Sequence, residues 1–489
     1  MRLKVEREKI YFYPDSKRVI ARYFELDGKK ALALISKVNR MTGAEVNEIL
    51  DRVLRDFSKR HRNITRIFEK HFNKAKHYLG HFHINPDLYD INRKLLIGSY
   101  FSMEYSIESS ALFNPSIVEH PDQSELEDGQ KRVIISLRAT GERHISSIVF
   151  RSGIIDKNNN FIFDPAGKNI GEAELIKQYV YDKILFTQWL NEIEILNDIS
   201  LGVLKSLENN FIYSELEKCI SEIQHKDKLD LDAQKTLKEM LWLAKSHYEI
   251  IFSKDTDISE RVIFPISGAE SNGIEDARFV KFTDDNGEIT YYATYTAYDG
   301  YTTLPNLLET KDFYHFIAKP LHGEYVRDKN FALFPRKING LYYMVSRVDG
   351  FNHYIMSSDN INIWEEGNLL LEPEYYWELV QVGNSGSPIE TNAGWLMIVH
   401  GVGPMRKYCM SALLLDLNNP SKVIARLKEP FIVPNNEERE GYVPNVVYSC
   451  GSIINNNDLI IPYAISDYAS TFAFIKLEEL LKNMESTQA

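Results

Sequence analysis

The chain has 489 residues, of which 44% are hydrophobic and 12% aromatic, and it carries a formal net charge of −12. This composition is typical of a folded globular protein of two or three domains and excludes a long disordered chain. The negative charge argues against a nucleic-acid partner, because no basic domain is available to meet a phosphate backbone.

Three cysteines, Cys219, Cys409 and Cys450, are widely spaced and odd in number. They indicate a reducing compartment without a disulfide framework, and their spacing predicts no metal site. Residues 1–15 lack the apolar segment of a secretion signal, and no apolar run in the sequence is long enough to span a bilayer. We therefore expect a cytoplasmic protein with no membrane partner, no metal and no cofactor.

The first part of the chain predicts strands and then helices. Residues 1–40 alternate polar and apolar side chains, which favours two or three strands. Thr42 and Glu45 then form a candidate capping box, and apolar residues follow at helical spacing as far as Phe57. A second helix is predicted over about 63–79. We interpret 1–97 as an N-terminal strand-and-helix extension of a β domain.

That β domain is predicted to span 98–489 and to contain a helical insertion at 172–255. The insertion is rich in Leu, Glu and Lys, contains no Pro, and repeats apolar residues every three or four positions, which predicts three or four helices. The pattern on either side, at about 98–165 and from 258 onward, is typical of short strands joined by Gly, Asn and Asp turns.

Five segments of the β domain share an apolar run that ends in a polar residue near a turn. They are RVIISLRATG (132–141), YYATYTAYDG (291–300), LYYMVSRVDG (341–350), GWLMIVHGVG (394–403) and LIIPYAISDY (459–468). With the insertion removed, the distances between them suit one four-stranded unit each. This weak repeat predicts a mainly β protein built as a five-bladed β-propeller, and the alternative is a large β-sandwich with coincidental repeats.

The polar residues at these strand ends form a candidate site. Four segments end in Arg138, Arg347, His400 and Asp467, and the remaining one is preceded by Glu275, Asp276 and Arg278. Any one of them could be a surface ion pair. On the inner strands of a propeller they would instead converge, and a pocket with both arginines and carboxylates suits a polyhydroxyl ligand beside an anion. Glycosyl transfer in particular needs a carboxylic acid to protonate the departing sugar oxygen.

Nine segments of the chain resemble glycoside hydrolase family 130, and they occur in the family's order. They are FNPSIV (113–118), SLRATG (136–141), GIEDARF (273–279), YTAYDG (295–300), LFPRKINGLYYMVSR (333–347), SGSPIETNAGWLMIVHG (385–401), LLLDLNNPSKVIAR (413–426), GYVPNVVYSCG (441–451) and YAISD (463–467). The resemblance implies a five-bladed propeller that acts on β-mannosides as an inverting phosphorylase or hydrolase. It favours a homo-oligomer, and it leaves the helices at 42–80 and 172–255 outside the common family core.

The resemblance also implies roles for individual residues. The aspartate of the family's Glu-Asp-Pro-Arg motif is the proton donor, which matches Asp276, although Ala277 stands in place of the proline. The family's phosphate ligands match Lys329, Asn330, Arg347 and His400, with lysine in place of the usual arginine at the first position. Sugar-binding positions match Asn114, Arg138, Glu438 and Asp467, with Glu275 and Arg278 beside the acid and Glu437 competing with Glu438.

Three functions remain open from the sequence. Potential positive charge on Lys329, Arg347 and His400 favours phosphorolysis of a β-mannoside oligosaccharide, with inorganic phosphate as the co-substrate. A hydrolase would instead need a carboxylate base, Glu438 or Asp467, about 6.5–9.5 Å from the acid. The third alternative is a non-catalytic sugar-binding protein.

Overall fold

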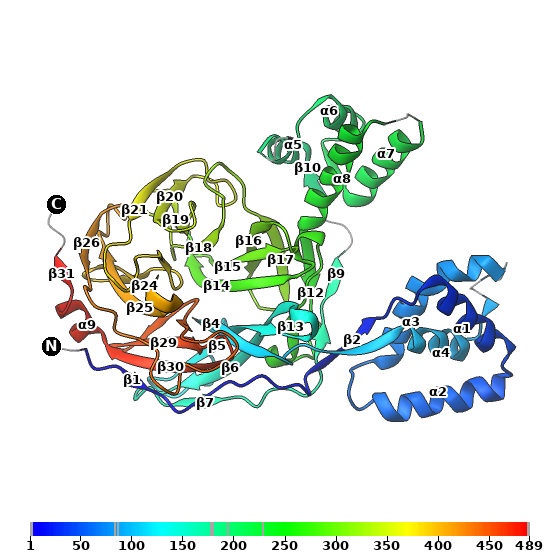
Figure 1. Cartoon of the computed structure of the whole chain (residues 1–489), viewed down its shortest axis with the longest axis horizontal. Coiled ribbons are helices and arrows are strands. Elements are labelled where there is room, and N and C mark those ends of the chain that lie inside the picture. Colours follow the sequence, from blue (N-terminus) through cyan, green and yellow to red (C-terminus); the bar gives the residue numbers. More distant parts are fainter. Residues whose placement is uncertain are drawn as a thin grey trace.

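The computed structural model describes residues 3–82, 85, 88–176, 180–192, 195–226 and 229–486. The protein is mainly β, with its sheets gathered around a common centre and two helical parts that project from one side (Figure 1). Within these ranges no helix is both long and apolar enough to cross a membrane.

The sheets are built from five successive antiparallel units. The first consists of β4 (Ala111–Glu119), β5 (Lys131–Thr140) and β6 (Ser146–Ile155), edged by β7 (Phe161–Phe163) and β13 (Arg261–Ile263). The second consists of β14 (Gly273–Thr283), β15 (Ile289–Tyr298), β16 (Thr303–Thr310) and β17 (His315–Pro320). Gly273 of β14 pairs in parallel with Ser146 of β6, which joins these two units into one large sheet.

The other three units are separate sheets. The third consists of β18 (Lys329–Leu333), β19 (Tyr342–Arg347), β20 (His353–Ser358) and β21 (Gly367–Leu371). The fourth consists of β22 (Gln381–Asn384), β23 (Ile389–Thr391), β24 (Gly394–Val402), β25 (Tyr408–Leu415), β26 (Val423–Arg426) and β31 (Glu485–Ser486). The fifth consists of β27 (Val447–Tyr448), β28 (Ile453–Asn455), β29 (Asp458–Ile465), β30 (Ala469–Lys476) and β1 (Glu6–Arg7), with α9 (Leu477–Lys482) after it.

The five repeated segments occupy equivalent positions in these units, because they form β5, β15, β19, β24 and β29. Each of these strands pairs with a neighbour on both sides. Interior strands covered on both faces carry continuous apolar runs, and every residue of β24 is buried.

Apolar cores lie between neighbouring units. Buried side chains of the first unit pack against the second, those of the second against the third, and so on to the fifth. The fifth unit then packs against the first, where Phe472 and Phe474 meet Ile117 and Val133. The five units thus form a closed series of contacts.

The prediction of strands throughout 1–40 is wrong for its last third. Among residues 3–40, β1 and β2 (Val19–Tyr23) are the strands, which agrees with two of the two or three expected, but α1 (Gly28–Arg40) follows them. The Asp27 side chain accepts hydrogen bonds from the first free backbone N–H groups of α1, and Ala31, Ile35 and Val38 are buried at helical spacing. This cap and spacing outweigh the local alternation of polar and apolar residues.

The N-terminal helices form a part with its own apolar core. The predicted capping box of Thr42 and Glu45 is confirmed at the start of α2 (Gly43–Phe57). α3 (Ile64–Ala75) and a 3₁₀ turn (Lys76–Phe82) correspond to the second predicted helix, whereas α4 (Ile91–Tyr100) was not predicted. β2 pairs with β3 (Ser102–Ser106) and links these helices to the first unit.

In the described part of 172–255, four helices pack around a separate apolar core. They are α5 (Lys183–Glu192), α6 (Asp198–Lys205), α7 (Tyr213–Lys226) and α8 (Leu231–Ser246), with short strands β8 (Gly171–Glu172), β9 (Glu174–Ile176), β10 (Val180–Asp182), β11 (Asn210–Ile212) and β12 (Tyr248–Ile251). β12 pairs with β17 and with β9, so the two ends of the insertion extend the sheet of the second unit.

Candidate active site

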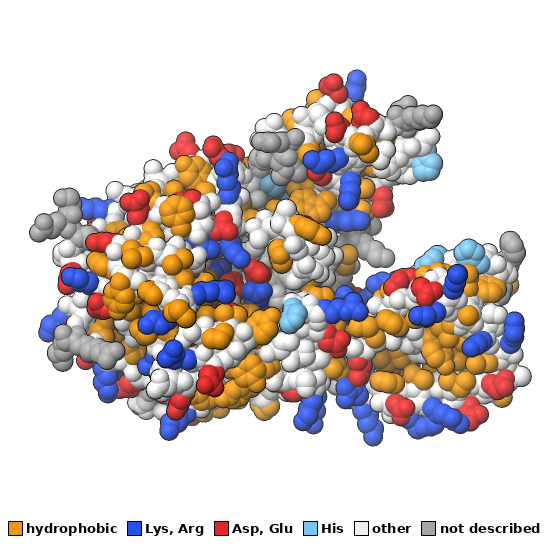
Figure 2. Space-filling view, viewed as in Figure 1, with side chains coloured by type: hydrophobic (Ala, Val, Ile, Leu, Met, Phe, Trp, Pro, Cys, Tyr) orange, Lys and Arg blue, Asp and Glu red, His pale blue; other side chains and the backbone are white. Residues whose placement is uncertain are grey.

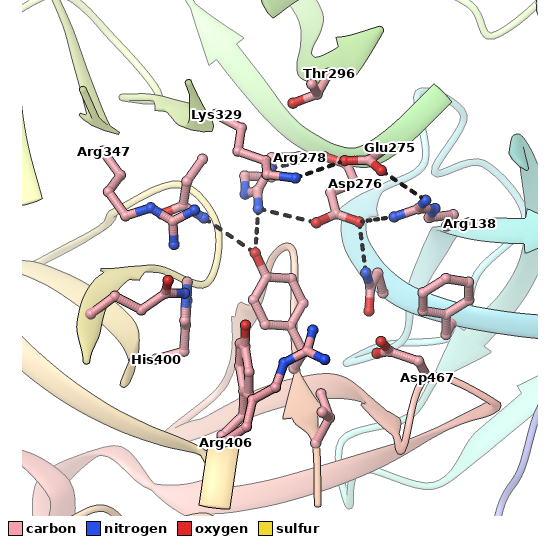
Figure 3. Close-up of a pocket in the computed structure, with 17 residues that line it drawn as sticks. Arg138, Glu275, Asp276, Arg278, Thr296, Lys329, Arg347, His400, Arg406 and Asp467 are labelled. Carbon is pink, nitrogen blue, oxygen red and sulfur yellow. Dashed lines mark hydrogen bonds and ion pairs between the residues drawn. The ribbon is translucent and has the colours of Figure 1, made fainter. Parts of the chain in front are cut away.

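A cavity lies where the five units converge, and Figure 2 shows Lys, Arg, Asp and Glu side chains gathered in this hollow. Every predicted site residue except Glu438 lines it: Asn114, Arg138, Glu275, Asp276, Arg278, Lys329, Asn330, Arg347, His400 and Asp467 (Figure 3). Residues more than 300 positions apart in the sequence therefore share one site.

Three first strands turn two consecutive side chains into the cavity by the same device. β4, β14 and β18 each contain a bulge, at Asn114, Asp276 and Asn330 respectively. These residues have left-handed backbones, with φ of 49°, 49° and 76°. Asn and Asp tolerate this conformation better than other non-glycine residues, and a bulge breaks the alternation of a strand. Glu275 and Asp276 can therefore both face the cavity, which adjacent residues of a regular strand cannot do.

The carboxylate of Asp276 is held from three sides. Its Oδ1 accepts a hydrogen bond from Asn114 Nδ2 at 2.6 Å and another from Arg138 Nη1 at 3.3 Å. Arg278 lies 3.7 Å from its Oδ2 and donates to its backbone oxygen at 3.0 Å. Burial alone would raise the pKa of Asp276, but Arg138, Arg278, the Asn114 hydrogen bond and Lys329 outweigh it and lower the pKa. Asp276 is therefore ionised in the ligand-free site.

Glu275 links three units across the cavity. Its Oε1 pairs with Arg138 Nη2 at 3.1 Å, and its Oε2 pairs with Lys329 Nζ at 3.2 Å. These side chains come from β14, β5 and β18. The pairing holds Lys329 next to the acid, although its side chain remains 40% exposed and thus accessible to a ligand.

Arg347 and His400 form the opposite wall of the cavity from Arg138 (Figure 3). Arg347 is 7% exposed, and its Nε and Nη2 lie 3.3 Å from Asp328 Oδ2. His400 Nδ1 lies 3.0 Å from the carbonyl oxygen of Asn384, which can only accept, so Nδ1 carries the hydrogen and Nε2 is a free acceptor. Burial, followed by the charges of Arg347 and Arg278, lowers the pKa of His400 far below its ordinary value. The expected positive charge on His400 is therefore wrong for the ligand-free site.

Asp467 behaves in the opposite way to Asp276. It lies in a turn directly after β29, where Ser466 and Asp467 both have left-handed backbones. Burial and the negative charge of Asp276 raise the pKa of Asp467 to about 7, although Arg138 and Arg406 act against this. Near neutral pH, a large part of Asp467 is thus protonated.

Comparison with known proteins identifies the family of this chain. Residues 234–486 match the sequence model of glycoside hydrolase family 130, described as beta-1,4-mannooligosaccharide phosphorylase. The chain belongs to this family. The resemblance found in the sequence is therefore confirmed.

Among curated members of family 130, the chain is similar to a 1,2-beta-oligomannan phosphorylase of Thermoanaerobacter sp., with 35% identity over 43% of this chain and 71% of that protein. It is also similar to a beta-1,2-mannobiose phosphorylase of Listeria innocua, with 31% identity over 49% of this chain and 69% of that protein. A solved structure of beta-1,2-mannobiose phosphorylase from Listeria innocua covers 76% of this chain and 92% of its own, with 22% identity and a TM-score of 0.46.

The structure adds cavity residues that the sequence did not single out: Phe113, Thr296, Gln381, Arg406, Tyr408, Val446 and Tyr448. Tyr448 lies within GYVPNVVYSCG, one of the segments that resemble family 130, and its hydroxyl accepts a hydrogen bond from Arg278 Nη2 at 2.5 Å. Its place in that segment was therefore an available signal. Arg406 lies in the loop after the strand of His400, where no pattern in the sequence distinguishes it from other loop arginines.

Glu438 is a predicted family 130 site residue that lies outside the cavity. It is 4% exposed, and its Oε1 accepts hydrogen bonds from Arg7 Nε at 3.0 Å and Tyr463 Oη at 2.6 Å. The competing Glu437 is exposed. Glu438 thus joins β1 to the fifth unit, and its carboxylate does not face the other site residues.

Proposed function

We propose that this chain cleaves β-mannosidic bonds by inverting phosphorolysis and releases α-mannose 1-phosphate, with Asp276 as the proton donor. The observation that carries the proposal is the balance of charge in the cavity. Five lining side chains are Arg or Lys and three are Asp or Glu, so a phosphate anion would meet a surplus of positive charge. The curated relatives named above are both phosphorylases of mannosides.

The five units serve this function as the blades of a five-bladed propeller. The closed series of apolar cores supports this arrangement, as do the equivalent positions of the repeated strands. In such a fold the inner strands bring their polar ends to one funnel. The helices of the extension at 1–97 and those of the insertion at 172–255, which interrupts the catalytic domain of 98–489, then project from the propeller, and we place them at contacts between copies in a homo-oligomer.

In the proposed reaction a phosphate oxygen attacks C1 of the mannosyl residue from the face opposite the leaving group. The bond between C1 and the glycosidic oxygen breaks, and the proton of Asp276 reaches that oxygen, directly or through a sugar hydroxyl. Because Asp276 is ionised in the ligand-free site, it must gain its proton when the ligands bind. A phosphate dianion near Lys329 and Arg347 offsets their positive charge and raises the pKa of Asp276.

Phosphate is assigned to Lys329, Asn330, Arg347 and His400, of which Arg347 and His400 lie on the wall opposite Arg138 (Figure 3). Arg347 offers a planar donor group and Lys329 a point charge. The free Nε2 of neutral His400 would accept the hydrogen of a protonated phosphate oxygen. Asn114, Arg138, Glu275, Arg278 and Asp467 then remain for the sugar.

A hydrolase is less well supported, because the cavity has a surplus of cationic side chains and the curated relatives named above are phosphorylases. Asp467, whose pKa of about 7 suits a general base at neutral pH, is the residue that a hydrolase would use to activate water. Glu438 lies outside the cavity and is occupied by Arg7 and Tyr463. Phosphate needs no base of this kind because it is already a nucleophile.

Product analysis with and without inorganic phosphate tests the proposal, with β-1,2-mannobiose, β-1,4-mannobiose and mannosyl-glucose as substrates. We expect α-mannose 1-phosphate to form only in the presence of phosphate. Release of free mannose at the same rate without phosphate would instead establish a hydrolase.

The Asp276→Asn variant separates an enzyme from a sugar-binding protein. Its turnover should fall by about 10²–10⁴-fold, the usual contribution of a general acid, while its affinity for the mannoside is retained. The matched control is Asp285→Asn, at an exposed turn before β15, which should leave turnover unchanged. Equal turnover in the two variants would exclude Asp276 as the proton donor.

A further inference from the structure

Two neighbouring units each present an exposed aromatic side chain on a turn of the same type. The turns after β15 and β19 have the sequences Asp-Gly-Tyr-Thr (299–302) and Asp-Gly-Phe-Asn (349–352). In each turn the aspartate Oδ1 accepts hydrogen bonds from the backbone N–H groups two and three positions further along the chain. In the first turn these are Tyr301 and Thr302, at 2.8 and 2.7 Å, and in the second they are Phe351 and Asn352, at 3.0 and 2.8 Å. The glycines have φ of 100° and 84°. Both turns are thus fixed by the same chemistry.

The aromatic side chains on these turns point away from the protein core. Tyr301 is 96% exposed and Phe351 is 49% exposed. A single exposed aromatic residue needs no explanation, but a fixed turn that presents one in two adjacent units indicates a function at that position.

Both turns lie at the mouth of the cavity. The turn of Tyr301 follows the strand whose Thr296 lines the cavity, and the turn of Phe351 follows the strand whose Arg347 lines it. The carbonyl oxygen of Phe351 also accepts a hydrogen bond at 3.0 Å from the backbone of Val382, next to the lining residue Gln381.

A third exposed aromatic residue, Tyr442, lies near the cavity residue Asp467 of the fifth unit. Tyr442 is 52% exposed, and its hydroxyl lies 3.0 Å from His144 Nδ1, with the two rings 5.8 Å apart. Val443, the next residue, donates its backbone N–H to Ser466 at 2.9 Å, beside the lining residue Asp467. We name Tyr301, Phe351 and Tyr442 the aromatic rim.

We propose that the aromatic rim binds the part of a β-linked oligosaccharide that extends out of the cavity, and so makes longer chains better substrates than disaccharides. This inference rests on the proposed function, because a sugar whose C1 bond is cleaved inside the cavity must direct the rest of its chain across the mouth. Pyranose rings offer C–H faces that pack on aromatic rings, and tyrosine adds a hydroxyl for their polar edges. Turns fixed before binding lower the entropy cost of that contact.

Steady-state kinetics at saturating phosphate test the aromatic rim, with a β-linked mannobiose and the corresponding tetrasaccharide as substrates. Wild-type protein should have the lower KM for the tetrasaccharide. Tyr301→Ala and Phe351→Ala should each raise that KM by about 3- to 10-fold, the loss of one aromatic contact, and leave the KM for mannobiose within about two-fold. Tyr301→Phe, which keeps the ring, should retain most of the preference.

The matched control is Tyr100→Ala, which removes a 41% exposed tyrosine from the end of α4, away from the cavity (Figure 1). Unchanged tetrasaccharide KM in both rim variants would overturn the proposal. So would sedimentation showing that wild-type protein self-associates through these residues and that Tyr301→Ala abolishes the association.

Calorimetric titration of the tetrasaccharide without phosphate separates this inference from the proposed function. If wild-type protein turns over no mannoside, and the Tyr301→Ala variant binds the tetrasaccharide more weakly than wild type does, the role of the aromatic rim stands and the proposed reaction is wrong. If mannobiose is phosphorolysed but neither variant weakens tetrasaccharide binding, the reaction stands and the aromatic rim is wrong.

Discussion

Asp467→Asn should stabilise the ligand-free protein, and by more at high pH than at low pH. The pKa of Asp467 rises from the ordinary 3.8 to about 7 in the folded protein, so the folded protein binds this proton more tightly than the unfolded chain does. Stability is therefore lost as the pH rises from 3.8 toward 7, and asparagine removes this loss. At about 1.4 kcal/mol for each tenfold change in proton affinity, the upper limit is about 4 kcal/mol.

The measured gain should be smaller than this limit, at about 1 to 3 kcal/mol, because Asp467 lines an open cavity where water screens the repulsion from Asp276. Thermal unfolding followed from pH 5 to pH 8 is the assay. The melting temperature of Asp467→Asn should exceed that of wild type at both ends of this range, by a few degrees at pH 8 and by clearly less at pH 5, because part of the loss already occurs between pH 3.8 and pH 5. A difference that is constant across this range, or a variant less stable at pH 8, would refute the reasoning.

Three further predictions concern single side chains. Arg347→Lys should raise the KM for phosphate about tenfold or more and leave the KM for the mannoside unchanged, because lysine loses the planar donor group. Arg7→Ala should lower the free energy of unfolding by about 1 to 3 kcal/mol in denaturant titration, since Glu438 would lose its cationic partner, while kcat stays unchanged. Gly273→Ala should lower the melting temperature, because its Cβ would lie 2.8 Å from the backbone nitrogen of Ser146 at a φ of 129°; an unchanged melting temperature would show that this contact relaxes freely.

Much of the fold could be predicted from local patterns. Apolar runs such as that of β24 mark interior strands, and the periodic apolar residues of α8 mark a helix. α1 and α4 were missed for a physical reason. α1 buries only a narrow stripe, and α4 buries the consecutive residues Leu95 to Gly98, a short apolar run that is equally compatible with a strand.

The site was predictable where strand ends carry the chemistry, and less so where loops do. Arg138, Arg347 and His400 lie at the ends of repeated strands, so their convergence follows from the repeat. Arg406 reaches the cavity from a turn whose path the sequence does not define. The ionisation of the two aspartates was also beyond sequence, because it depends on which cations lie within a few ångströms of each carboxylate.

The pairing of β1 with β30 has a consequence for how the chain is made. Glu6 pairs with Phe474, so synthesis of 468 further residues separates one partner from the other. At roughly 5–20 residues per second, the ribosome needs on the order of half a minute to a minute and a half to bring the two strands together. During that time the edge that β30 will cover has no strand beside it. Chaperones that bind extended segments would therefore have a long opportunity at β1, and a bulky group attached next to β1 should slow its pairing with β30.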